Sequence, residues 1–169
     1  MNKFPKILII GHARHGKDSF AEILKEEFGL KFLSSSQAAS DIFIYSKLKD
    51  KYGYTSPEEC FLDRVNHRAE WYDLICEYNK KDPARLAKEI LKITDCYVGM
   101  RSSIEIKECL NKGIIDLVIW VDASDRLPLE DKSSFDIDKH CADFIVDNNS
   151  SYEDFKNRTI RIGKSLICK

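Results

Sequence analysis

The chain has 169 residues, and its 27 Lys and Arg against 28 Asp and Glu leave a net charge of −1. This length suffices for one domain with a sizeable core. The 43% hydrophobic and 33% charged residues exclude a disordered or collagen-like chain, and the balanced charge argues against a nonspecific nucleic-acid binder. No apolar run reaches the about 18 residues of a membrane span.

We therefore expect a single domain over residues 1–169 that stays in the cytoplasm. The apolar run at residues 6–10 leads into a glycine loop without a small-residue cleavage site, unlike a signal peptide. The cysteines form no CxxC pair and have no histidine at zinc-finger spacing, which favours small apolar core residues in a reducing compartment. They are Cys60, Cys76, Cys96, Cys109, Cys141 and Cys168.

Short β-rich runs alternate with longer helical runs along the chain. Residues 6–10 (KILII) are typical of a strand buried on both faces, and residues 17–28 carry apolar side chains at helical spacing. Further strands are expected at 30–33, 95–100, 114–121 and 143–146. Further helices are expected at 37–50, over most of 57–92, at 102–111 and at 152–167.

The alternation predicts an α/β fold in three layers, with a parallel sheet between helices on both faces. We expect five strands and a helical insertion on the substrate side at about 37–92. The polar and irregular stretch at about 122–138 is expected to be a short lid.

The sharpest motif lies between the first strand and the first helix. It reads GxxxxGK, the phosphate-binding P-loop, in the strand–loop–helix context that this motif requires. Its glycines let backbone N–H groups point at phosphate oxygens, and the helix N-terminus adds partial positive charge. The residues expected to bind a nucleotide are Gly11, His12, Ala13, Arg14, His15, Gly16, Lys17, Asp18 and Ser19.

Lys17 is expected to reach the β- and γ-phosphates as a point charge. The residue after this lysine is usually Ser or Thr, whose hydroxyl binds Mg²⁺, but here it is Asp18. Asp18 is expected to ligate Mg²⁺ directly or through water, or to balance the helix dipole. Ser19 is the other candidate, because its hydroxyl lies one position later.

Several segments resemble the deoxynucleoside monophosphate kinases of bacteriophages. They are GKDS at 16–19, NHRAEWY at 66–72, DPARL at 82–86, YVGMRS at 97–102, DLVIWVD at 116–122 and ADFIVDN at 142–148. The resemblance implies an adenylate-kinase-like fold, ATP with Mg²⁺ as phosphoryl donor, and a deoxynucleotide acceptor. It also extends to phage P-loop kinases that phosphorylate 5-hydroxymethyluracil in DNA. These motifs do not distinguish the two groups of kinases.

Phosphoryl transfer needs alignment and positive charge more than covalent chemistry, so arginines are the candidates for the acceptor side. Arg101 directly follows a predicted central strand, where ligands of open α/β sheets bind. Arg126 lies in the expected lid, where it would close over the phosphates. With Lys17, these two arginines are the expected catalytic residues, although a surface location is the alternative for both.

The remaining acceptor-site candidates are Asp41, His67, Arg68, Trp71 and Arg85. Asp41 is placed only by its position after the second strand, and Trp71 is a candidate for stacking on a base. His67 and Arg68 lie in a charge-rich helix, for which a solvated face is the alternative. Arg85 is in a first helical turn, where a cation gains nothing from the dipole.

Three functions remain open from the sequence. The first is transfer of a phosphoryl group from ATP to a free deoxynucleoside monophosphate, giving dNDP and ADP. The second is phosphorylation of hydroxymethylated pyrimidines in DNA, against which the near-neutral charge weighs. The third is a nucleotide-binding switch that does not catalyse transfer. A homodimer is compatible with all three, and none requires a membrane.

Overall fold

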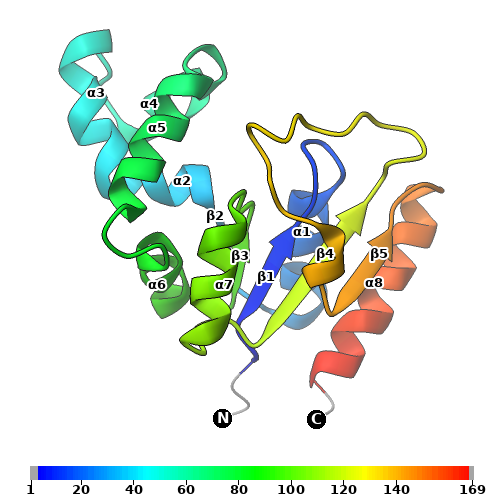
Figure 1. Ribbon diagram of the computed structural model, residues 1–169. Helices are drawn as coiled ribbons and strands as arrows, with labels where there is room; N and C mark the ends of the chain where they lie inside the picture. Colours follow the sequence, from blue (N-terminus) through cyan, green and yellow to red (C-terminus); the bar gives the residue numbers. More distant parts are fainter. Residues whose placement is uncertain (1–3, 168–169) are drawn as a thin grey trace.

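The computed structural model describes residues 4–167, in which five parallel strands form one sheet (Figure 1). The strands are β1 (Ile7–Ile10), β2 (Phe32–Ser34), β3 (Cys96–Val98), β4 (Leu117–Asp122) and β5 (Phe144–Asp147). Their order is β2-β3-β1-β4-β5, and each neighbouring pair is parallel. The expected five-stranded parallel sheet is confirmed, with strand ends displaced by one to three residues.

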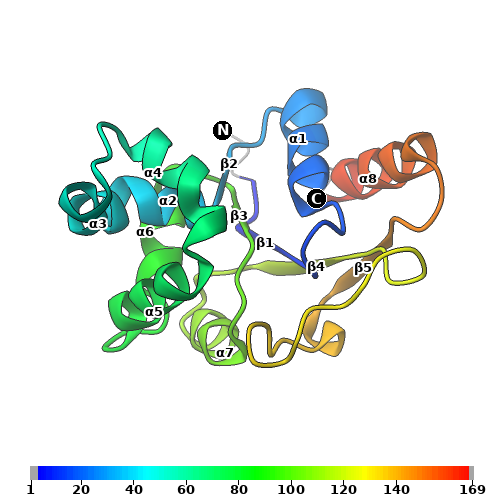
Figure 2. The same ribbon diagram turned by 90° about the horizontal axis from the view of Figure 1, so that it is seen from above.

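Helices cover both faces of the sheet, which Figure 2 shows from above. They are α1 (Lys17–Phe28) and α8 (Tyr152–Ile167) on one face, and α6 (Arg85–Ile93) and α7 (Ser103–Asn111) on the other. Among the described residues, no helix is both long and apolar enough to cross a membrane.

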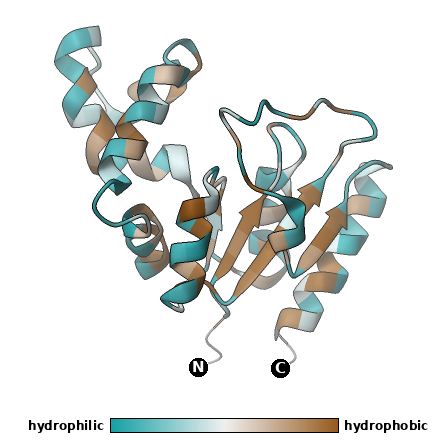
Figure 3. Cartoon of the chain, in the orientation of Figure 1, coloured by the Kyte–Doolittle hydropathy of each residue, from teal (hydrophilic) through white to brown (hydrophobic). Residues whose placement is uncertain are grey.

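The pleat of β1 divides the core into two parts. Ile7 and Ile9 pack in the cluster beneath α1 and α8, whereas Leu8 and Ile10 pack in the cluster beneath α6 and α7. All four side chains are fully buried, which explains why this strand reads as a continuous apolar run. Figure 3 shows the strands as hydrophobic, whereas the helices mix hydrophobic and hydrophilic residues.

Between β2 and α6 the chain forms the helical insertion, which stands beside the sheet (Figure 1). It contains α2 (Ser35–Ala39), the π-helical turn η1 (Ser40–Ile44), α3 (Tyr45–Tyr52), α4 (Pro57–Asp63), the 3₁₀ turn η2 (Arg64–Asn66) and α5 (Arg68–Asn79). The single helix expected at 37–50 is therefore wrong in detail. The buried Ser40 hydroxyl donates to the Pro57 carbonyl at 2.7 Å, and this tertiary contact fixes the widened turn.

The crossing segment (residues 123–138) follows β4 and passes over the carboxyl ends of the strands without regular structure (Figure 1). Phe135 and Ile137 anchor its second half, because both side chains are buried in the core with α6 and α7. A 3₁₀ turn, η3 (Lys139–Cys141), then leads into β5.

The cysteines follow the sequence expectation in part. Cys60, Cys96 and Cys109 are buried, as predicted for small core residues. Cys76 and Cys141 are exposed, so for them the prediction is wrong. Cys168 lies outside the described residues.

Candidate functional site

The P-loop runs from β1 to α1, and its backbone requires glycine at both ends. Gly11 has φ 141°, and a Cβ there would lie 2.4 Å from the Val121 carbonyl oxygen. Gly16 has φ 105°, and a Cβ there would lie 2.5 Å from the Asn148 amide nitrogen. Any larger residue would therefore strain the backbone and push the loop away from β4 and β5.

Two side chains hold the loop against the sheet. Asn148, just after β5, donates through Nδ2 to the His15 carbonyl at 2.9 Å. The His15 ring is 0% exposed, accepts at Nδ1 from the Ala123 N–H at 3.0 Å, and lies 3.1 Å through Nε2 from the Pro128 carbonyl. These partners require a neutral imidazole with its proton on Nε2. The His15 ring therefore shapes the loop, with no nitrogen left for a phosphate.

Lys17 opens α1 and reaches back over the loop, where its Nζ donates to the His12 carbonyl at 2.7 Å. Burial, followed by the positive charge of Arg101, lowers the pKa of Lys17 to about 8. The charge of Glu130 acts in the opposite direction. The charges of Lys17 and Arg101 thus act on each other, and two neighbouring cations give this end of the sheet the positive potential that a polyanion site requires.

Arg101 comes to this end of the sheet from a different strand than Lys17. It follows β3, and α7 after it covers the face opposite α1. The chain therefore leaves β1 and β3 in opposite directions, and such a switch point in a parallel sheet opens a crevice at the carboxyl ends of the strands. The predicted pairing of Lys17 and Arg101 in one site is consistent with this geometry.

Glu130, on the crossing segment, binds both Arg101 and the P-loop backbone. Its Oε2 accepts from the Ala13 N–H at 2.8 Å, and its Oε1 lies 2.5 Å from Nη1 of Arg101. Burial opposes the charged form, but the hydrogen bond and charge of Arg101 outweigh it, so the pKa of Glu130 is lowered. Sequence reasoning missed this residue, because 117 positions separate it from Ala13.

The candidate magnesium ligands occupy the first turn of α1. Asp18 and Ser19 are both exposed, and the Asp18 carboxylate has no hydrogen-bond partner among residues 4–167. Asp122, at the end of β4, is by contrast engaged by the N–H and hydroxyl of Ser124. A free carboxylate beside the phosphate loop suits Mg²⁺, which prefers hard oxygen ligands. The residues present therefore fit a magnesium ion at Asp18.

A groove of about 340 Å³ extends from the loop toward α8. Its lining residues are Arg14, Gly16, Ser19, Arg126, Asn148, Ser150, Tyr152 and Phe155. Arg126 donates through Nε to the Asn148 carbonyl at 2.7 Å. Arg14 has φ 65°, a left-handed conformation that turns its exposed side chain to this groove. Arg126 therefore lies on the α8 side of the loop, whereas Arg101 lies on the α7 side.

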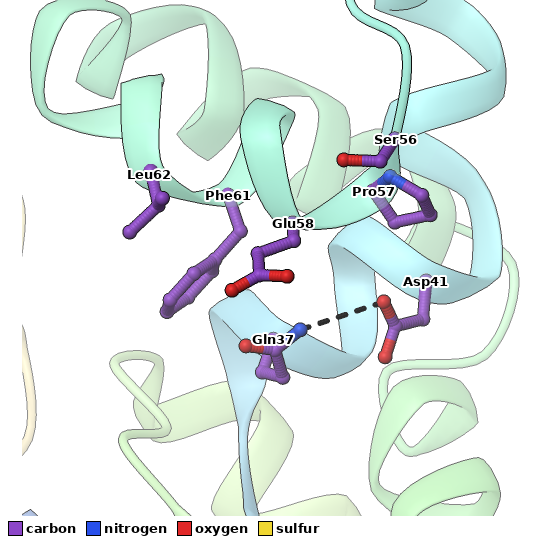
Figure 4. Close-up of a pocket in the computed structure, with 7 residues that line it drawn as sticks. All are labelled: Gln37, Asp41, Ser56, Pro57, Glu58, Phe61 and Leu62. Atoms are coloured by element: carbon purple, nitrogen blue, oxygen red, sulfur yellow. Dashed lines mark hydrogen bonds between the residues drawn. The ribbon is translucent and has the colours of Figure 1, made fainter.

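A second recess, of about 420 Å³, lies within the helical insertion (Figure 4). Its lining residues are Gln37, Asp41, Ser56, Pro57, Glu58, Phe61 and Leu62. Gln37 donates through Nε2 to Asp41 at 3.4 Å, which leaves the Gln37 oxygen and much of the Asp41 carboxylate open. The predicted substrate residue Asp41 therefore lies in a recess with amide and carboxylate groups, next to an aromatic ring.

Arg64 connects this recess with the P-loop. Its guanidinium lies 3.8 Å from the centre of the Phe61 ring and donates to the Phe61 carbonyl at 2.8 Å. Burial, and then the charge of Arg68, lower the pKa of Arg64, while Asp18 of the P-loop counteracts them. The charge of Asp18 thus acts on Arg64 of the insertion, and Arg68 is a second cation near Arg64.

Three predicted substrate residues have other partners. Trp71 is 4% exposed and belongs to the core, so it is not available to stack on a base. His67 lies 3.1 Å from Asp63 and stacks on Tyr52. Arg85 covers the Tyr78 ring at 3.9 Å. For Trp71 the substrate prediction is wrong, because α5 turns this side chain inward.

Comparison with protein-family models and with curated proteins finds no match. Solved structures match instead. A gluconokinase from Sinorhizobium meliloti 1021 has 13% identity and a TM-score of 0.52, covering 98% of this chain and 95% of that chain. A shikimate kinase from Bacteroides thetaiotaomicron has 8% identity and a TM-score of 0.51, covering 97% and 99%.

The chain has the fold of the P-loop kinases. The match extends over nearly the whole length of both partners, so the helical insertion and the crossing segment fall within the same overall architecture. At these identities the likeness concerns the fold, and the chemistry must be argued from the residues of this chain.

Proposed function

We propose that the protein transfers the terminal phosphoryl group of ATP to a deoxynucleoside monophosphate, giving ADP and a deoxynucleoside diphosphate. The observation that carries this proposal is the convergence of Arg101 and the Ala13 N–H of the P-loop on one anion, the Glu130 carboxylate, with Lys17 near enough for its charge to act on both side chains. A guanidinium and a backbone N–H on one anion, with a lysine nearby, are the kind of charge arrangement that a transferring phosphoryl group needs.

The donor would lie along the P-loop, with its phosphates on the N–H groups and Lys17, and its nucleoside in the groove of Arg14 and Arg126. A magnesium ion held by Asp18 would neutralise charge on the β- and γ-phosphates. His15 and Asn148 would keep the loop in place during this binding, because the His15 ring is bonded to Ala123 and Asn148 holds the His15 carbonyl.

The acceptor would lie between the insertion and the loop. Arg64 and Arg68 supply charge for its phosphate, and the recess with Gln37 and Asp41 supplies hydrogen-bonding groups for a base. In the reaction, an oxygen of the acceptor phosphate forms a bond to the γ-phosphorus, and the bond between this phosphorus and the ADP oxygen breaks. A phosphate monoester has a second pKa of about 6, so at pH 7 the attacking oxygen is already deprotonated and needs no protein base.

The first experiment measures ATP consumption with Mg²⁺ against a panel of acceptors. The panel contains each deoxynucleoside monophosphate, hydroxymethyl-dUMP, and duplex DNA containing 5-hydroxymethyluracil. Turnover on a free monophosphate that is lost in Lys17→Ala supports the proposal. Turnover on the modified DNA alone would replace it with the DNA kinase, and ATP binding without any turnover would replace it with a switch module.

A further inference from the structure

Glu130 occupies the phosphate-binding loop with the contacts of a bound anion. One carboxylate oxygen accepts from the Ala13 N–H at 2.8 Å, and the other lies 2.5 Å from the Arg101 guanidinium. Its own backbone N–H donates to Nδ1 of His12 at 3.0 Å. Glu130 is therefore bonded to the loop through both its side chain and its backbone.

The charge balance explains why a carboxylate lies there. Lys17 is partly desolvated and feels the charge of Arg101, and two like charges without an anion are costly in such a place. Glu130 supplies that anion when no nucleotide is bound. A phosphoryl group offers the same chemistry, namely negative oxygens that accept from N–H groups and from a guanidinium. The carboxylate and a terminal phosphoryl group would therefore compete for the same donors.

The crossing segment is anchored on both sides of Glu130, so Glu130 can move with only a short stretch of chain. Before it, the Pro128 carbonyl is bound by the buried His15 ring at 3.1 Å. After it, Phe135 is buried, and Asp136 accepts from the Ser103 N–H at 2.7 Å and from the Ser103 hydroxyl at 2.9 Å. Between these anchors, Leu129 is 62% exposed. Displacing Glu130 thus requires movement of about six residues, with both ends of the segment fixed.

We propose that Glu130 is an internal competitor of the donor's terminal phosphoryl group, a latch that keeps the loop closed until a triphosphate displaces it. The inference rests on the proposed donor site, since it assumes that phosphates bind at Ala13, Lys17 and Arg101. It gives the crossing segment a regulatory role. Donor binding breaks the Arg101–Glu130 pair, which frees Arg101 for the transferring group and opens residues 129–134.

The test compares Glu130→Gln with the matched control Asp131→Asn. Asp131 is the neighbouring carboxylate of the same segment, but it accepts from the Ser133 N–H at 2.8 Å instead of from the loop. Calorimetry measures the Kd of Mg-ATP, Mg-ADP and inorganic tripolyphosphate for each protein, and thermal unfolding measures the stability of each protein without nucleotide.

Glu130→Gln should bind ATP and tripolyphosphate at least about tenfold more tightly than the wild type, because the competing conformation loses its charged contacts. The gain should be smaller for ADP, which lacks the terminal phosphoryl group. The same variant should melt at a lower temperature without nucleotide, because Lys17 and Arg101 lose their counter-charge. Asp131→Asn should change none of these affinities. Glu130→Asp, which keeps the charge but is shorter, should bind ATP with intermediate affinity.

If Glu130 is a competitor, Glu130→Gln binds ATP more tightly and melts at a lower temperature without nucleotide. Replacement of a purely structural residue would lower both the ATP affinity and the stability. Equal ATP affinity of the wild type and Glu130→Gln, or an equal gain in Asp131→Asn, would overturn the latch alone. Nucleotide binding that is tight but yields no phosphoryl transfer would overturn the kinase proposal, and the latch would still be decided by the Kd values. Failure of every variant to bind tripolyphosphate or nucleotide would overturn both.

Discussion

The two sides of the cleft are built in different ways. On the P-loop side, backbone geometry is fixed by contacts with strand ends: Gly11 lies against Val121, and Asn148 holds the His15 carbonyl. On the insertion side, polar side chains such as Arg64 and Asp41 come from short helical turns. The backbone of the phosphate-binding half is therefore fixed before a ligand binds, whereas the acceptor half depends on individual side chains.

Replacement of Lys17 gives the largest expected effect. Lys17→Ala should lower kcat/KM for phosphoryl transfer by about 10³-fold or more, because it removes the main charge on the transferring phosphates. Its melting temperature should not fall, because burial disfavours the charged lysine. Lys25→Ala on the same helix is the control, since Lys25 pairs with Glu22 at the surface. Equal losses of activity in both variants would contradict the P-loop assignment.

Two arginine variants compare the crevice beside the P-loop with helix α6. Arg101→Ala should lower kcat/KM by about 10² to 10³-fold, as loss of one charge-stabilising donor does. Arg85→Ala removes the cover of Tyr78 and should change kcat/KM by less than about twofold. Steady-state kinetics measures both. If Arg85→Ala is as damaging as Arg101→Ala, the acceptor site extends to α6 and the comparison fails.

Glycine variants test whether the loop backbone is rigidly determined. Gly16→Ala adds a Cβ at φ 105° that meets the Asn148 amide at 2.5 Å. It should weaken ATP binding at least about tenfold and destabilise the protein by more than about 2 kcal/mol. Gly29→Ala, at φ 76° with nothing within 4 Å of the added Cβ, should cost about 1 kcal/mol and leave ATP binding unchanged. An equal loss of ATP affinity in both variants would contradict a rigidly determined backbone in the P-loop.

The smallest expected effect concerns Glu105, near the acceptor side on α7. Burial raises its pKa to about 7, although Asn79 donates a hydrogen bond to it at 2.9 Å. The folded protein therefore holds this proton at pH values where the unfolded chain has released it. Stability should fall as pH rises from about 4.5 to 7, by about 1 to 3 kcal/mol.

Urea unfolding from pH 5 to 8 checks this dependence. Glu105→Gln should remove most of the slope, and Glu108→Gln in the same helix should retain it. If Glu105→Gln keeps the slope of the wild type, another group causes the pH dependence of stability.

The sequence predicted the P-loop side well, because its motif lies within nine consecutive residues and its strand and helix adjoin it. The five-stranded sheet followed from apolar runs in the same way. The acceptor-side candidates depended on weaker signals, since tertiary contacts decide where such side chains lie. Trp71 lies in α5 and Arg85 in α6, and only packing decides that one enters the core and the other covers Tyr78.

Glu130 carried no signal in the sequence, because an acidic residue in a polar segment looks the same whether it faces solvent or the P-loop. The π-helical turn at Ser40–Ile44 was equally invisible, since it results from the contact between Ser40 and Pro57. In both cases the decisive partner is distant in the sequence or depends on one buried hydroxyl. Periodicity does not contain that information.

The central place of β1 has a consequence for how the protein is made. β1 precedes the other four strands of the sheet in the chain, yet its neighbours in the sheet are β3 and β4. Until Val98 has been synthesised, the hydrophobic run Ile7–Ile10 has neither neighbour to pair with, and its second neighbour is complete only at Asp122. Long-range parallel pairing of this kind folds slowly and leaves apolar strands exposed to aggregation. The nascent chain should therefore depend on chaperones most strongly during the interval between the first and fourth strands.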